Sequence, residues 1–129
     1  MPSPTKQPIA YRATTAMAVL RAFAGAFSWI SPRHAWRTFL LGAMPADGST
    51  GLISRLFGIR DLLLAAGLRH PDASVRRAVL GAGIVIDSAD IAATALAVRA
   101  GAPRGTLLGV AAGAALFVAM GAVALAEGD

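Results

Sequence analysis

Arg60 and Asp61 are adjacent charged residues inside an otherwise apolar stretch, and Asp87 and Asp90 lie three positions apart in the middle of a second one. Ionisable side chains at the depth of a bilayer usually face the interior of a helix bundle, pair with one another and mark functional sites. Enzymes that transfer protons usually place an acid beside a base. We therefore predict that Arg60, Asp61, Asp87 and Asp90 are the catalytic residues of an acid–base site within a membrane.

The stretch that contains Arg60 and Asp61 extends from Leu52 to Leu68. If its charges lay at the water interface, only the eight residues from Asp61 to Leu68 would remain. Eight residues cannot cross about 30 Å of hydrocarbon, which needs about 20 helical residues. Either the helix does not span or it spans with charges near mid-depth, and we favour the span. Each central Arg or Asp costs about 2.5 to 3.5 kcal/mol to insert, so this helix needs partners inside the protein.

The composition indicates a membrane protein. The chain has 129 residues, of which 56% are hydrophobic, and this fraction is too high for a soluble domain of that size. Its glycine and alanine content favours closely packed helices, and its apolar runs lack the alternation of a membrane β-barrel. The predicted fold class is all-α, an integral membrane four-helix bundle with charged residues at mid-depth.

We predict one domain over residues 1–129. A polar tail covers 1–12, a loop with room for an amphipathic helix covers 31–50, and the spans cover 13–30, 52–68, 78–98 and 106–126. Four spans place both termini on one side of the membrane. Basic residues favour cytoplasmic termini by a single charge, so we expect a multi-pass protein of the cell membrane.

Depth can be compared between the predicted spans. Asp61 and Asp87 are each the tenth residue of their span and Arg21 is the ninth of the first, so all three lie near the midplane. We expect Arg60, Asp61 and Asp87 to form one hydrogen-bonded cluster. Around it we predict a substrate-binding set made of Arg55, Arg21, Phe57, Gly58 and Thr94.

Glycines recur at every fourth position at the start of the last predicted span, at Gly105, Gly109 and Gly113. Such a stripe forms a smooth face against which a neighbouring helix can pack. The neighbour can belong to the same chain or to a second copy, so a homo-oligomer through these glycines stays open.

Several classes of site and partner are excluded or disfavoured. The chain has no cysteine, hence no disulfide, thiolate metal site or thiol nucleophile. His34 and His70 have no second ligand nearby, and we predict neither a metal nor a cofactor. The net charge of +5 comes mostly from arginines scattered at helix ends and inside spans. These residues are typical of anchors to a lipid bilayer and not of a nucleic-acid surface, and the Arg and Ala richness suggests a high-GC bacterial genome.

The stretch Gly51-Leu-Ile-Ser-Arg55-Leu-Phe-Gly58-Ile-Arg60-Asp61-Leu-Leu-Leu precedes Asp87-Ser-Ala-Asp90 by some 25 residues. This pattern resembles the small four-helix bacterial membrane proteins classed as domain of unknown function 4267. The resemblance covers the second and third predicted spans and the overall length. It implies a four-helix fold and a signature made of Gly58, Arg60, Asp61, Asp87 and Asp90, and it supplies no reaction.

Two classes of function follow. The first is an intramembrane acid–base enzyme that acts on a lipophilic small molecule by isomerisation, cyclisation or epoxide opening. Asp and Arg groups suit the last reaction because a carboxylate can activate water while a carboxylic acid protonates the departing oxygen. The alternative is a non-catalytic membrane subunit, or a module for lipid or small-molecule binding or transport, in which the Asp and Arg cluster is structural.

Overall fold

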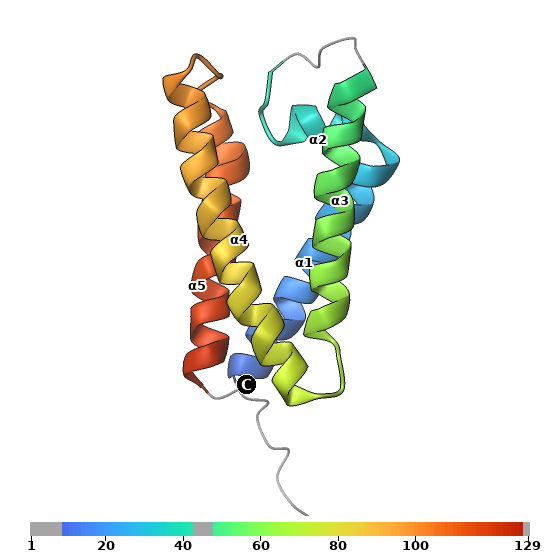
Figure 1. Ribbon diagram of the computed structural model, residues 1–129, viewed down its shortest axis with the longest axis vertical. Helices are drawn as coiled ribbons and strands as arrows, with labels where there is room; N and C mark the ends of the chain where they lie inside the picture. The colour runs from blue at the N-terminus through green and yellow to red at the C-terminus, as the bar shows by residue number, and fades with distance from the viewer. Residues whose placement is uncertain (1–8, 43–47, 128–129) are drawn as a thin grey trace, which may run out of the picture.

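Five α-helices make up almost all of the structure, a computed structural model that describes residues 9–42 and 48–127 (Figure 1). No strand occurs within these two ranges. The helices are α1 (Ile9–Ile30), α2 (Pro32–Thr38), α3 (Gly48–Leu68), α4 (Ala73–Arg99) and α5 (Ala112–Ala126). A π-helical segment, η1 (Leu107–Ala111), leads directly into α5.

The helix bounds correct two sequence predictions. Helix α1 begins at Ile9, so residues 9–12 are helical and do not belong to a polar tail, while residues 1–8 lie outside the described ranges. Helix α3 begins at Gly48, inside the segment expected to be a loop. In the same segment, α2 has Ala35 buried and Arg33 exposed.

Helix α4 follows a capping residue, Asp72. The side chain of Asp72 accepts a hydrogen bond of 2.8 Å from the backbone N–H of Ser74, which satisfies one of the free donors of the first turn. The Ser74 hydroxyl donates to the same oxygen. These two bonds lower the pKa of the exposed Asp72 carboxyl below its ordinary value, because they favour its charged form.

The long helices form two pairs, α1 with α3 and α4 with α5 (Figure 1). The pairs converge near the C-terminal end of α5 and diverge toward the end of the molecule that holds α2. At the converging end, buried apolar side chains from all four helices form the core, namely Met17, Ala18, Leu68, Leu80 and Ala124.

Among the residues that the structure describes, three segments are long and apolar enough to cross a membrane, namely α1, α4 and the continuous Leu107–Ala126. Large apolar side chains also face outward, among them Phe23 at 72% and Leu108 at 74% exposed, as lipid contact requires. The structure therefore indicates a membrane protein. Helix α3 is not among the three candidates, since it carries Arg55, Arg60 and Asp61.

Glycines allow the closest approaches between segments. A Cβ atom added at Gly58 would lie 2.6 Å from the carbonyl oxygen of Gly25, so α1 and α3 touch there backbone to backbone. Gly58 is thus a packing residue, and its part in substrate binding stays a prediction. A Cβ at Gly109 would lie 1.9 Å from the Phe39 oxygen, which assigns this glycine to a contact within the chain. Gly105 likewise faces Leu40 of the same chain.

Candidate functional site

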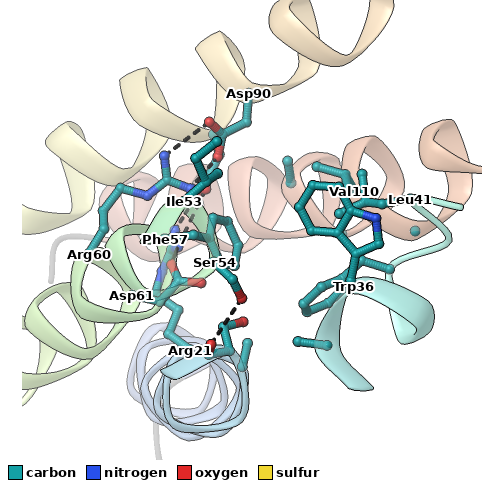
Figure 2. Close-up of a pocket in the computed structure, with 18 of the residues that line it drawn as sticks. Arg21, Trp36, Leu41, Ile53, Ser54, Phe57, Arg60, Asp61, Asp90 and Val110 are labelled. Atoms are coloured by element: carbon teal, nitrogen blue, oxygen red, sulfur yellow. Dashed lines mark hydrogen bonds and ion pairs between the residues drawn. The ribbon is translucent and has the colours of Figure 1, made fainter. Parts of the chain in front are cut away.

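One buried arginine joins two buried aspartates from two other helices. Arg21 of α1 donates from Nη1 to Asp61 Oδ1 of α3 at 3.0 Å and to Asp87 Oδ1 of α4 at 3.4 Å. Its Nη2 also donates to Asp87 Oδ2. The three residues are only 1%, 2% and 3% exposed, respectively. We call Arg21, Asp61 and Asp87 the triad, and Figure 2 labels its members Arg21 and Asp61.

Local sequence leaves room for the guanidinium group. Gly83 precedes Asp87 by about one helical turn, and a Cβ atom there would lie 3.3 Å from Nη2 of Arg21. A larger side chain at this position would push the guanidinium away from the carboxylate. On its other side the Cζ atom of Arg21 is 4.2 Å from the centre of the Phe117 ring, a distance at which a cation is attracted by an aromatic face.

A second ion pair links α3 to α4 beside the triad. Arg60 donates from Nη1 and Nη2 to the two oxygens of Asp90 at 3.1 and 2.7 Å, a two-point geometry that suits arginine. The side chains of this pair are 31% and 23% exposed. The predicted cluster of Arg60, Asp61 and Asp87 is thus corrected, because Arg21 is the partner of both buried aspartates. Adjacent residues point about 100° apart on a helix, so Arg60 and Asp61 face different neighbours.

The structure places the remaining predicted binding residues, Arg55, Thr94 and Phe57, in different surroundings. Arg55 is exposed and donates from Nε to the Trp29 carbonyl at 3.3 Å, so it does not join the charged cluster. Thr94 is buried and donates to the Asp90 carbonyl of its own helix at 2.7 Å. Phe57 lines the space beside the triad, with its ring centre 4.7 Å from the Arg60 Cζ atom.

A cavity of about 280 Å³ lies between the two helix pairs, with the triad in its wall. Figure 2 shows Arg60, Asp61 and Phe57 on one side of this space and Trp36 and Leu41 across from them. The rest of the lining is mostly small or apolar and comes from every helix and from η1, with Ala24, Phe39, Val110, Ala114 and Phe117 among its members. We call this space the inner cavity.

Sequence reasoning missed several residues of this wall. Ser28 and Ser54 are buried and line the inner cavity, and each lies seven positions from a triad residue, Arg21 and Asp61 respectively. A spacing of seven keeps two residues on one helix face, and this signal could have identified them. Trp36 could not be found in this way, because it lies on a separate short helix.

A second and more open cavity, of about 590 Å³, lies between α3 and α4 near α2. We call it the outer cavity. It shares Arg60, Asp90 and Trp36 with the inner cavity. Its own lining includes the exposed apolar residues Leu56 and Ala93. The Arg60 and Asp90 pair therefore lies where the outer cavity meets the inner one.

If all five side chains were ionised, these two arginines and three aspartates would carry one net negative charge. Within the described ranges, no group of three or more His, Cys, Asp or Glu side chains is arranged to hold a metal ion. The chemistry available to the site is proton transfer, hydrogen bonding and charge stabilisation.

Comparisons with protein-family models, with curated proteins and with solved structures find no match to this chain. The resemblance to the family of unknown function therefore stays a prediction.

Proposed function

We propose that this protein is a membrane-embedded acid–base enzyme that acts on a lipophilic small molecule held in the inner cavity. The observation that carries the proposal is Arg21 bonded to both Asp61 and Asp87 in the wall of an otherwise apolar cavity. Two carboxylates with one arginine reach neutrality when they share one proton. One of them then serves as a base and the other as an acid, as acid–base catalysis requires.

Hydrolytic opening of an epoxide uses all three groups of the triad. One carboxylate takes a proton from water while the water oxygen forms a bond to an epoxide carbon. The bond from this carbon to the ring oxygen breaks, and the other carboxylic acid gives its proton to that oxygen. Water is added and a diol is formed, while Arg21 holds both carboxylates in place. Isomerisation or cyclisation would use the same acid and base.

The lipophilic character of the substrate is argued from the surroundings of the site. The wall around the triad is mostly apolar, and the outer cavity is bordered by exposed apolar residues of α3 and α4. In a bilayer these residues would face lipid tails. A substrate dissolved in the membrane would thus reach the triad from the side, past Arg60 and Asp90.

The proposal includes α3 as a fourth span in a multi-pass protein of the cell membrane with cytoplasmic termini. Its most costly charges, Arg60 and Asp61, are turned inward and paired with other helices. Pairing inside the bundle offsets the cost that a charged residue at mid-depth carries. Arg55 lies nearer the start of α3, where a long side chain can reach the headgroups.

The test uses membrane-soluble epoxides in proteoliposomes, with diol formation followed by mass spectrometry. Asp61→Asn and Asp87→Asn should each lower the rate by about a hundredfold to ten-thousandfold, the usual contribution of an acid or base. Asp72→Asn is the matched control, because Asp72 is an exposed carboxylate outside the cavities, and it should keep full activity. If the wild type opens no epoxide, or Asp87→Asn is fully active, the reaction is wrong.

A second candidate function has an observation of its own. The ion pairs connect α1 to α3, α1 to α4 and α3 to α4, so they can fix how the two helix pairs are held together. A non-catalytic membrane subunit, or a module for lipid or small-molecule binding or transport, would need nothing more from them. In that case Asp87→Asn would change the stability and assembly of the protein with no turnover to lose.

A further inference from the structure

The inner cavity has a second polar level above the triad. Ser28 follows Arg21 by seven residues in α1, and Ser54 precedes Asp61 by seven in the antiparallel α3. Seven helical residues correspond to roughly 10.5 Å along the axis. The two serines meet at this level, since Ser54 Oγ donates to the Ser28 carbonyl at 2.9 Å.

Unpartnered polar atoms are concentrated in this cavity. Within the described ranges, three buried side-chain nitrogen or oxygen atoms have no hydrogen-bond partner, namely Ser28 Oγ, Trp36 Nε1 and Arg60 Nε. All three residues line the inner cavity. Buried polar groups in native proteins are almost always hydrogen-bonded, so these three atoms can form hydrogen bonds to a molecule bound in the cavity.

The three atoms belong to different parts of the cavity wall, on three different helices. Arg60 lies beside Asp61, whereas Trp36 lies across the cavity from both (Figure 2). Ser28 is on the level two turns away from the triad. The rest of the wall includes Ala24, Phe57, Ala114 and Phe117, whose side chains offer no hydrogen bonds.

We propose that Ser28 Oγ and Trp36 Nε1 form a second polar subsite, which binds an uncharged oxygen at the far end of a lipophilic ligand whose other polar group reaches the triad. This inference rests on the proposed function and narrows its substrate to a molecule with oxygens at both ends. An indole N–H can only donate, so the ligand atom beside it is an acceptor such as a hydroxyl, ether or carbonyl oxygen. Neither Ser28 nor Trp36 is charged, so an ionised group would lack a counter-charge here.

The test compares three probes with one chain length, namely decane, decanol and decanediol. Each is titrated into the purified protein in detergent, and the apparent dissociation constant is obtained from the shift of the melting temperature with probe concentration. Decanediol should bind about tenfold more tightly than decanol, because one additional neutral hydrogen bond lowers the dissociation constant by about this factor. Decanol should in turn bind more tightly than decane.

Two double variants show whether the second subsite is responsible. Ser28→Ala with Trp36→Phe should abolish the advantage of decanediol over decanol and leave decane binding unchanged. Ser88→Ala with Trp29→Phe is the matched control, because Ser88 and Trp29 are exposed and line neither cavity. This control should bind all three probes as the wild type does.

The outcomes separate this inference from the proposed function. If no probe shifts the melting temperature, the binding of a lipophile in the cavity fails, and the inference fails with it. If decane and decanol bind but the second hydroxyl adds nothing, or its advantage survives in the Ser28 and Trp36 double variant, the second subsite alone is wrong. Water molecules that simply satisfy the three atoms would give this second result.

Discussion

Arg21 is the counter-charge of two buried carboxylates at once, so the members of the triad should differ in their effect on stability. Arg21→Gln leaves Asp61 and Asp87 without a positive partner, and an uncompensated buried charge costs about 3 to 5 kcal/mol. In Asp87→Asn, the positive charge of Arg21 is still balanced by the negative charge of Asp61. The loss of stability should therefore be clearly smaller. Denaturant unfolding in detergent would measure both.

Arg60→Gln is the matched control for Arg21→Gln. Arg60 serves one carboxylate and the pair is partly exposed, whereas Arg21 serves two carboxylates that are almost fully buried, so Arg60→Gln should destabilise the protein less than Arg21→Gln. Because Arg60 does not bond to Asp87, Arg60→Gln should not restore an Asp87→Asn variant. Equal losses for Arg21→Gln and Arg60→Gln would contradict the central place of Arg21.

The depth of each charged residue along its helix could be predicted from the sequence. The direction in which its side chain points around the helix axis could not. Counting positions placed Asp61, Asp87 and Arg21 at one level, and Arg21 bonds to both aspartates. The choice between Arg21 and Arg60 as their partner depends on how each helix is rotated about its axis. That rotation is set by contacts such as Gly25 against Gly58, which no single apolar run reveals.

At the level of helices, the contact between Gly25 and Gly58 gives a sharp prediction. Gly58→Ala places a methyl group 2.6 Å from a backbone oxygen, which must push α1 and α3 apart and should destabilise the protein by about 1 to 3 kcal/mol. Gly81→Ala is the control, because its Cβ would meet nothing within 4 Å. That change should be neutral or stabilise by up to about 1 kcal/mol. Equal stabilities of the two variants would refute the close contact.

The start of α4 should depend on pH through Asp72. The pKa of this carboxyl is lowered in the folded protein by its hydrogen bonds from Ser74, so its stabilising effect is complete above the unfolded pKa. The effect is lost as the pH falls through the folded value. The melting-temperature difference between wild type and Asp72→Ala should therefore shrink at acid pH.

Asp72→Asn serves as the control for this pH dependence, because asparagine also caps helices and does not titrate. Its own cap should persist in acid, so the difference between Asp72→Asn and Asp72→Ala should stay constant. If the melting-temperature difference between wild type and Asp72→Ala also stays constant as the pH falls, the charge of the Asp72 carboxylate does not contribute to the stability of the helix start.

The long helices could be predicted because apolar runs bounded by turn residues determine them. Their ends were less predictable, as the starts of α1 at Ile9 and α3 at Gly48 show. Tyr11 and Arg12 are ordinary helix residues, and a polar side chain does not end a helix at a membrane surface. The short α2 brings Trp36 to the cavity, a placement that depends on the whole chain.

The whole molecule is two helix pairs that diverge around a charged site (Figure 1). Within the triad, the Arg21–Asp61 ion pair lies inside the first helix pair, and the Arg21–Asp87 ion pair crosses to the second. Under the proposed four-span topology, this arrangement would pair Arg60 and Asp61 of α3 inside the protein. The four-span prediction therefore depends on α3.

A chain without cysteine allows this to be tested with single introduced thiols. Gly48→Cys lies at the start of α3, where a side chain would meet nothing within 4 Å, and His70→Cys lies just after its end. If α3 spans, a membrane-impermeant maleimide should label the two positions from opposite sides. With cytoplasmic termini, Gly48→Cys is the one labelled from outside. Labelling of both from one side would show that α3 does not cross.

The same thiols can show whether the triad is what keeps α3 in the membrane. Each central Arg or Asp costs about 2.5 to 3.5 kcal/mol to insert, and in α3 this cost is met by partners on α1 and α4. In an Arg21→Gln background, Asp61 loses its partner, so a fraction of His70→Cys should become accessible from the Gly48 side. Arg55→Gln is the control, because Arg55 is exposed and pairs with no carboxylate in the described structure, and it should leave the labelling pattern unchanged. Unaltered labelling in both backgrounds would mean that packing, with Gly25 against Gly58, holds α3 without help from the ion pairs.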